Sequence, residues 1–313
     1  MCGFQSNLRK EMPMNFKEFE SEVLRYFRET LGEEYTISIN EVRKNNNIIR
    51  NGLLMKKRGQ SITPNIYLNR FYEQYIEGEE LQNIVDTIWS TYVEALQSFD
   101  AENFKFELDL EQQKDKIVYR LVSYQENEEK LKQLPHIRFL DLAITFYCFV
   151  ELREETLSMV CISHEMAKRW KTDVKGLLAY AHQNTPRLFP IVCNSLENVI
   201  RHMLNDERFE ELFCGQEDEV TMYVVTNESG INGATVMLYE DAFHEIAQNL
   251  GGKLIILPSS IHELILIPFD EAINTDYLVS LVKEVNLTQV PWEDVLSNNI
   301  YLYDFSTKSF EIL

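Results

Sequence analysis

The chain has 313 residues, and 45% of them are hydrophobic, so it carries enough apolar material for a buried core and is not a disordered protein. At roughly 150 residues per domain the length predicts about two domains. The formal net charge of -20 at pH 7 opposes non-specific binding to nucleic acid or to anionic membranes and favours basic partners.

The first hundred residues predict two helices and a small antiparallel sheet. Gly32 stops the first helix, Asn45–Asn47 supply left-handed turn residues, and Pro64 places its strand at an edge because it cannot donate to the ladder. The expected elements are a helix over 15–31, a hairpin with strands at 35–39 and 48–55, a strand over 62–68 and a helix over 79–99.

The middle of the chain predicts more helix and a second hairpin. The polar run 153–156 separates two strongly apolar segments, which indicates two largely buried strands, and Thr172 and Ser195 are suited to cap helices. The expected elements are helices over 111–124 and 126–134, strands over 140–152 and 157–162, and helices over 173–183 and 196–205.

An acidic segment, 206–219, is the predicted linker, because its carboxylates repel one another and extend the chain. After it we expect strands over 221–226 and 234–238, a helix over 240–250, strands over 254–257 and 263–268, a helix over 275–286, and a hairpin of 300–303 with 309–313. Hairpins outnumber βαβ units, so the expected class is α+β, with mostly antiparallel sheets flanked by helices. The expected domains are 14–205 and 220–313.

Cysteine usage and hydropathy predict a cytoplasmic protein. Five cysteines without a C-x-x-C pair indicate reduced thiols. No window reaches 18 consecutive apolar residues, so we expect no membrane-spanning helix, and the first 13 residues contain no apolar stretch typical of a signal peptide.

Charge is unevenly distributed along the chain. Residues 42–72 carry seven basic and no acidic side chains, whereas 216–313 carry 3 Lys and no Arg against 16 acidic residues. The basic segment predicts either a surface that binds phosphate or an acidic partner, through fields summed within a Debye length of about 10 Å, or simple neutralisation of the protein's own carboxylates. Its candidate binding residues are Arg43, Lys44, Arg50, Lys56, Lys57 and Arg58.

Known catalytic motifs are absent from the sequence. It has no P-loop, no dinucleotide-binding glycine motif and no nucleophile elbow, so no cofactor is expected. His164-Glu165 and His244-Glu245 each begin an H-E-x-x-H motif, but Lys168 and Gln248 stand where the second His should be.

Two similar runs remain as catalytic candidates, Ser163-His164-Glu165 and Ser260-Ile261-His262-Glu263, each beside a predicted buried strand. If they met in space, their imidazoles and carboxylates could hold a divalent metal, or a His could serve as base for a nearby Ser. The structural alternative is a helix-capping Ser followed by a surface His and Glu.

Several runs resemble those of a bacterial family of unknown function, from Met14 onward. They are 41–46, 63–68, 135–143, 184–188 and 257–263. The resemblance implies a bacterial cytosolic protein and brings no established activity, cofactor or catalytic residue.

Three hypotheses follow from the residues. The first is a non-enzymatic interaction or regulatory protein with a strongly acidic surface and a basic protein partner. The second is a metal-assisted or acid/base hydrolase that uses His164, Glu165, His262 and Glu263. The third, least favoured, is a nucleic-acid binder that uses the basic hairpin at 43–58; we expect no membrane partner.

Overall fold

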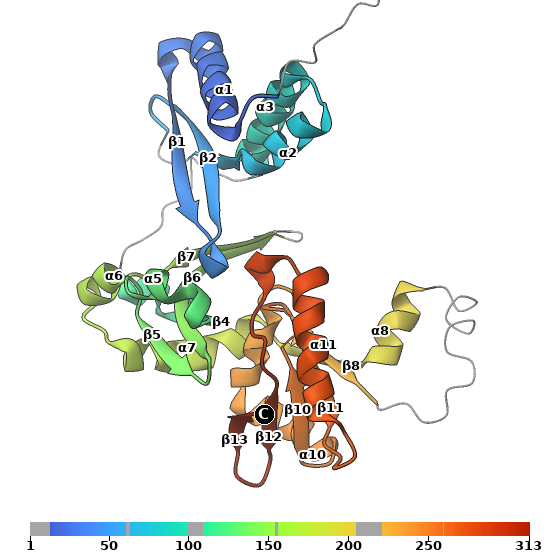
Figure 1. Cartoon of the computed structure of the whole chain (residues 1–313). Helices are drawn as coiled ribbons and strands as arrows, with labels where there is room; N and C mark the ends of the chain where they lie inside the picture. The colour runs from blue at the N-terminus through green and yellow to red at the C-terminus, as the bar shows by residue number, and fades with distance from the viewer. Residues whose placement is uncertain (1–12, 61–62, 99–108, 154–155, 205–220, 259) are drawn as a thin grey trace, which may run out of the picture. The chain divides into compact units, whose positions relative to one another are not determined.

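The computed structural model describes residues 13–60, 63–98, 109–153, 156–204, 221–258 and 260–313 (Figure 1). The chain divides into two compact units, one made of residues 1–44 and 49–106 and the other of residues 45–48 and 107–313. Every sheet in these parts is antiparallel, which confirms the predicted α+β class. The expected linker, 206–219, lies outside the described residues.

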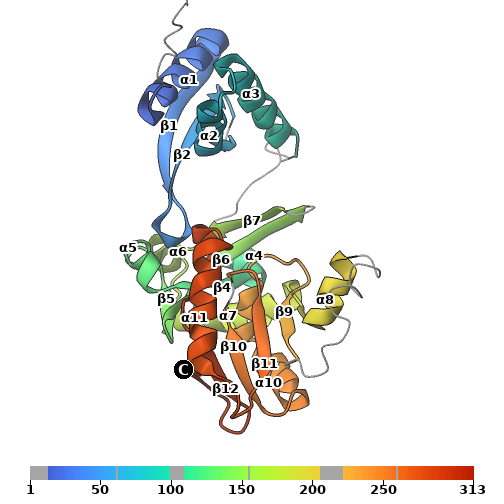
Figure 2. The ribbon, with the colours of Figure 1, turned by 45° about the vertical axis from the view of Figure 1, so that its right-hand side comes forward.

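The first unit packs three helices on one face of a three-stranded sheet (Figures 1 and 2). Asn15 and Glu18 form a reciprocal capping box at the start of the first helix, and apolar residues at helical spacing bury its inner face. The sheet order is β1-β2-β3, so the strand after Pro64 lies at an edge as predicted. The elements are α1 (Phe16–Leu31), η1 (Gly32–Glu34), β1 (Tyr35–Arg43), β2 (Ile49–Lys57), β3 (Asn65–Tyr67), α2 (Asn69–Glu77) and α3 (Leu81–Ser98).

The first half of the second unit is built around one long strand. β6 pairs with β4, β5 and β7, and α7 packs against β4. The predicted hairpin of 140–152 with 157–162 is confirmed by the β6–β7 pair. The elements are η2 (Asn45–Asn47), α4 (Leu110–Gln113), η3 (Lys114–Lys116), β4 (Ile117–Ser123), η4 (Gln125–Asn127), α5 (Glu128–Leu131), β5 (His136–Phe139), β6 (Leu142–Arg153), β7 (Thr156–Cys161), α6 (His164–Arg169) and α7 (Val174–Leu188).

The second half forms a six-stranded sheet in the order β13-β12-β10-β11-β9-β8. In both ribbon views α11 runs along β10 and β11, and Leu278 and Val282 on this helix pack against Ile255 and Ile267 (Figures 1 and 2). The elements are β8 (Ile191–Ser195), α8 (Leu196–Met203), β9 (Tyr223–Asn227), η5 (Gly233–Leu238), α10 (Glu240–Asn249), β10 (Lys253–Leu257), β11 (Leu264–Pro268), α11 (Thr275–Thr288), η6 (Trp292–Asp294), β12 (Tyr301–Asp304) and β13 (Ser309–Ile312).

Two predicted elements are wrong. The helix expected over 111–124 is helical only in its first half, in α4 and η3, and its second half is the strand β4. The apolar side chains of β4 are buried on both faces and therefore do not alternate with polar ones. The strand expected over 234–238 is the 3-10 helix η5, which follows a left-handed residue, Asn232 (φ 54). All six residues of η5 are buried, and this gives the segment the hydropathy of a core strand.

Strands on the two sides of the acidic segment 206–219 belong to one sheet. β8 precedes the segment and β9 follows it, and they pair antiparallel from Ile191 opposite Asn227 to Ser195 opposite Tyr223. The β8–β9 pair therefore brings the residues on both sides of this segment together, and the domains expected over 14–205 and 220–313 stay a prediction.

The asparagine turn Asn45–Asn47 belongs to the second unit, and its middle residue is buried there. Asn46 has a left-handed backbone (φ 51) and is 2% exposed. Each of its backbone and side-chain polar groups forms a hydrogen bond. Its Nδ2 donates to the carbonyls of Trp292 and Val295, and its backbone N–H donates to Asn127 Oδ1. Asn127 Nδ2 donates to Asn46 Oδ1, and Trp292 Nε1 donates to the Asn46 carbonyl.

One carboxylate joins the β5–β6 turn to the loop before β12. Asp141 Oδ2 accepts from the Ser297 hydroxyl at 2.6 Å and from Asn299 Nδ2 at 2.9 Å, and its Oδ1 accepts from the Tyr301 hydroxyl at 2.8 Å. This contact aligns the four-stranded sheet with the six-stranded sheet within the second unit, where the cavity described below is formed. No helix in the described ranges is both long and apolar enough to cross a membrane.

Candidate functional site

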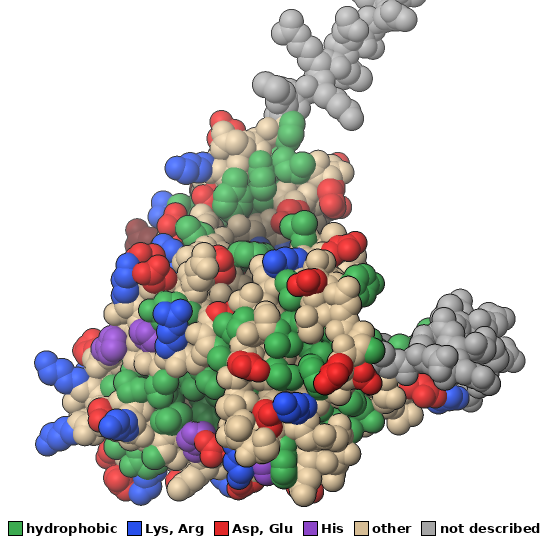
Figure 3. All heavy atoms as spheres, turned by 60° about the horizontal axis from the view of Figure 1, so that its bottom comes forward, with side chains coloured by type: hydrophobic (Ala, Val, Ile, Leu, Met, Phe, Trp, Pro, Cys, Tyr) green, Lys and Arg blue, Asp and Glu red, His purple; other side chains and the backbone are tan. Residues whose placement is uncertain are grey.

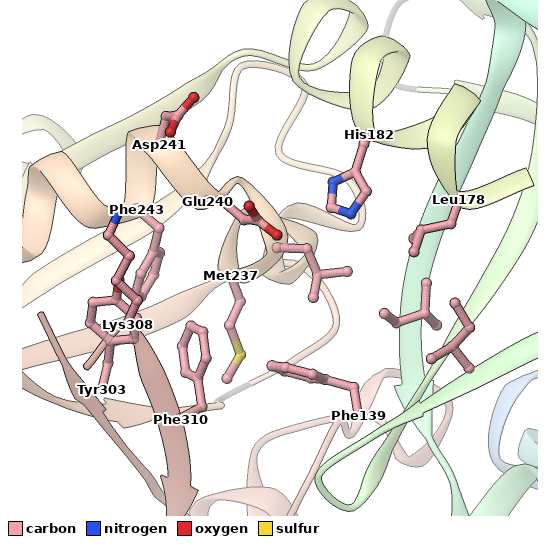
Figure 4. A pocket seen from close by; sticks show the side chains of 13 residues that line it. Phe139, Leu178, His182, Met237, Glu240, Asp241, Phe243, Tyr303, Lys308 and Phe310 are labelled. Atoms are coloured by element: carbon pink, nitrogen blue, oxygen red, sulfur yellow. The ribbon is translucent and has the colours of Figure 1, made fainter. Parts of the chain in front are cut away.

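A cavity of about 390 Å³ lies within the second unit, between the four-stranded sheet and the C-terminal hairpin. Figure 3 shows apolar side chains gathered around a hollow on this face, and Figure 4 shows the side chains that line the cavity. They come from β5, β6, α7, η5, α10, β12, β13 and the β12–β13 turn, namely Ile137, Phe139, Ile144, Leu178, His182, Met237, Leu238, Glu240, Asp241, Phe243, Tyr303, Lys308 and Phe310.

An aromatic cluster forms one wall of the cavity. Tyr303 and Phe310 are direct cross-strand partners on β12 and β13, and their ring centroids are 4.6 Å apart. Phe243 of α10 lies 5.2 Å from the Tyr303 ring, and Phe139 of β5 lies 5.4 Å from the Phe310 ring. The Phe139–Phe310 contact therefore joins the two sheets at the cavity.

Four polar side chains stand at this apolar surface: His182, Glu240, Asp241 and Lys308. Among the described residues, none of the four has a hydrogen-bond or ion-pair partner. His182 is half-buried and sits one turn after Leu178 on α7, whereas the other three are exposed. A mostly apolar cavity with a few convergent polar groups is typical of small-molecule sites.

The tyrosines around the cavity are held as neutral hydroxyls. Burial raises the pKa of Tyr119, whose ring meets His182 edge-on at 5.6 Å and whose hydroxyl donates to the Leu238 carbonyl. Burial also raises the pKa of Tyr239 and of Tyr303, and the charge of Glu240 adds to the rise for Tyr303. Phenols with raised pKa values do not act as bases at neutral pH.

The turn that carries Lys308 is stabilised by Asp304, at the end of β12. Its carboxylate accepts from the Ser306 hydroxyl at 2.6 Å and the Ser306 N–H at 2.8 Å, and it pairs with Lys253 at 3.1 Å. These hydrogen bonds lower the pKa of Asp304 from 3.8 to about 2. A carboxyl whose pKa is lower in the folded state stabilises the fold above its unfolded pKa.

We expect this contribution to be complete above pH 3.8 and to disappear as the pH falls to about 2. Asp304→Asn should therefore be less stable than the unmodified chain at neutral pH, and the difference should shrink over that interval. Urea unfolding of both proteins as a function of pH measures it. A difference that stays constant from neutral pH down to about pH 2 contradicts this role for Asp304.

The structure places the first predicted catalytic run at a helix start. Ser163 caps α6 by accepting from the Met166 N–H, and His164 and Glu165 are exposed in its first turn. Glu165 lies 3.8 Å from Arg169, one turn along the same helix. This arrangement matches the structural alternative considered for the run.

The second predicted run lies in a polar hollow lined also by Ser229 and Asp294. His262 Nδ1 accepts from the Asn232 N–H at 3.3 Å, so the neutral ring carries its hydrogen on Nε2, which faces Asp294 Oδ1 at 3.4 Å. Both ring nitrogens are thus engaged. The Ser260 hydroxyl is 3.4 Å from Glu263 Oε1 and accepts from the His262 N–H, so it contacts the carboxylate rather than the imidazole.

Within the described ranges, no three or more His, Cys, Asp and Glu side chains form a group that could hold a metal ion. The structure does not bring the two candidate runs together: Ser163, His164 and Glu165 at the start of α6 form no hydrogen bond or ion pair with Ser260, His262 or Glu263 before β11. The cysteines Cys148, Cys161 and Cys193 are free. Burial raises the pKa of Cys148 to about 12 and raises that of Cys161, so neither is a thiolate at neutral pH.

The basic residues of the hairpin form two groups rather than one. Strand register places Arg50 opposite Val42 near the turn and Lys57 opposite Tyr35 at the far end. Seven residues of strand separate these positions, about 23 Å at roughly 3.3 Å per residue, which exceeds two Debye lengths. Arg43, Lys44 and Arg50 therefore act separately from Lys56, Lys57 and Arg58, and the Lys44 ammonium lies over the Tyr67 ring.

Sequence reasoning missed all four polar residues of the cavity. His182 stands alone on its helix, and Glu240 and Asp241 read as ordinary acidic residues at a helix start. The available signal was the C-terminal hairpin, whose two short strands carry the aromatic residues Tyr301, Tyr303 and Phe310.

Comparison with known proteins gives a family match over nearly the whole chain. A model described as a family of unknown function (DUF5688) matches residues 16–305. No curated protein matches the chain, and no solved structure does. The match confirms the resemblance to an uncharacterised family that the sequence predicts.

Proposed function

The chain belongs to DUF5688, a family of unknown function, and we propose that it is a non-enzymatic binding protein whose site is the cavity beside the aromatic cluster. This keeps the interaction or regulatory function expected from sequence and moves its site from a charged surface to a cavity. The three free cysteines of the described residues support a cytoplasmic location, and the resemblance implies a bacterial one.

The single observation that carries the proposal is the composition of the cavity wall. About 390 Å³ is enough for a small organic molecule, since ligand sites measure roughly 300 to 1,000 Å³. Nine of the thirteen lining residues are apolar or aromatic, and the remaining four lack partners among the described residues. Polar groups left unpaired beside an apolar surface are available to orient a ligand.

Three features favour binding over catalysis. The lining residues include no Ser, Thr or Cys that could attack a substrate. The neighbouring tyrosines are neutral hydroxyls, as their raised pKa values indicate. The carboxylates at the rim are exposed to water, where an acid or base gains little from its surroundings.

We expect the full chain to bind 4-phenylbutan-1-ol, a neutral probe with an aromatic ring and an alkyl chain, measured by isothermal titration calorimetry. Leu178→Trp places a larger side chain in the cavity and should weaken binding about tenfold or more. Ala179→Trp is the matched control, because it adds the same side chain at an exposed neighbouring position that does not line the cavity.

Circular dichroism spectra must show that both variants fold. Equal affinities of Leu178→Trp and Ala179→Trp for the probe, or no heat of binding with the unmodified chain, would refute the proposed site.

A further inference from the structure

We infer that the ligand of this cavity is an organic cation, a protonated amine carried on an apolar body. The inference rests on the proposed function, because it names the chemical class that the same cavity takes. Three independent features of the lining lead to it: the carboxylates, the imidazole and the aromatic rings.

The first feature is a pair of carboxylates without counter-ions. Glu240 and Asp241 are the first two residues of α10, both are exposed, and neither has an ion-pair partner among the described residues. Figure 4 shows the Glu240 carboxylate directed toward the cavity. Its charge also acts on the aromatic cluster: burial is the main cause of the raised pKa of Tyr303, and the charge of Glu240 is the second.

The second feature is an acceptor on the facing element. In Figure 4 the His182 ring of α7 lies beside the same part of the cavity as Glu240. Neither ring nitrogen has a partner within the described part of the chain, so a neutral His182 has a free acceptor. An ammonium group has three N–H donors and can donate to the imidazole and to the carboxylate together.

The third feature is the aromatic wall. The rings of Phe243, Tyr303 and Phe310 lie 4.6 to 5.6 Å from one another, and the Phe139 ring lies 5.4 Å from that of Phe310. Aromatic faces attract cations through their quadrupole, and they also bury the apolar body of an amine. A carboxylate-bearing ligand would gain neither the quadrupole attraction nor the contact with Glu240.

Lys308 is the residue that opposes this inference. It lies in the β12–β13 turn with a left-handed backbone (φ 52), and Figure 4 shows it beside Phe243 and Tyr303, away from His182. The two carboxylates outweigh this one ammonium at the cavity. The segment 216–313 is also strongly acidic, with 3 Lys against 16 acidic residues, and its field favours a cation.

Three probes with the same apolar body separate the head-group chemistries: 4-phenylbutylamine, 4-phenylbutan-1-ol and 4-phenylbutanoate, each titrated into the full chain. We expect the amine to bind about tenfold more tightly than the alcohol and the acid to bind most weakly. Glu240→Gln should weaken binding of the amine about fivefold and leave binding of the alcohol unchanged. Lys308→Gln should not weaken binding of the amine.

The outcomes distinguish the inference from the proposed function. Equal binding of the three probes, or tightest binding of the acid with a loss in Lys308→Gln, overturns the cation preference and leaves the cavity as the site. Binding of none of the three probes overturns both. Tight amine binding that persists in Glu240→Gln contradicts the assigned contact and therefore the inference.

Discussion

Replacing Asn46 with alanine is expected to lower the free energy of unfolding of the second unit by about 3–5 kcal/mol. Its Nδ2 donates to the Trp292 and Val295 carbonyls at 2.7 Å, and its Oδ1 accepts from Asn127. Truncation leaves these buried groups without a partner, which costs about 1–3 kcal/mol each. Alanine also adopts the left-handed backbone of position 46 less readily.

Two further variants separate the lost hydrogen bonds from the backbone cost. Asn46→Gly removes the side chain but tolerates a positive φ, so it should retain most of the destabilisation. Asn47 also has a left-handed backbone (φ 58), but its side chain is exposed. Asn47→Ala should therefore lower the free energy of unfolding much less than Asn46→Ala does. Hydrogen exchange of β4 and β6 amides in urea measures unfolding of this unit, and equal effects of Asn46→Ala and Asn47→Ala would contradict the role of the buried amide.

Replacing Asp141 with alanine is also expected to lower the free energy of unfolding by about 3–5 kcal/mol. The hydroxyls of Ser297 and Tyr301 and the amide of Asn299 all donate to this carboxylate. Tyr301 is 0% exposed, so its hydroxyl has no access to water when Asp141 is removed. Because the contact aligns the two sheets that line the cavity, the variant should also bind the neutral probe more weakly.

A double-mutant cycle tests whether the loss comes from the buried hydroxyl. Tyr301→Phe should cost less in the Asp141→Ala background than in the unmodified chain, with a coupling of about 1–3 kcal/mol. Asp304→Ala is the control, because this carboxylate also accepts several hydrogen bonds but is only half-buried, and its removal should have a smaller effect. Additive effects of the two substitutions would refute the coupling.

Much of the secondary structure follows from local patterns. The capping box at Asn15, the apolar face of α3 and the β6–β7 hairpin were predictable because each depends on residues close together in the sequence. β4 was not, because burial on both faces removes the alternation that distinguishes a strand from a helix. The buried 3-10 helix η5 was misread for the same reason.

The candidate site was not predictable, because it depends on pairing between distant segments. Phe139 and Phe310 are far apart in the sequence and meet only when the two sheets are joined through Asp141. Motif searching instead selected His164 and His262. In the structure His164 is exposed and His262 uses both nitrogens to hold its turn.

The most direct test of the proposed binding site is an NMR experiment on the full chain with labelled methyl groups and 4-phenylbutan-1-ol as probe. The account predicts intermolecular nuclear Overhauser effects from the probe's ring to the methyl groups of Ile144, Met237 and Leu238, all of which line the cavity. It also predicts that Leu178→Trp abolishes them. Contacts confined to methyl groups elsewhere in the chain, or none at all at saturating probe, would contradict it.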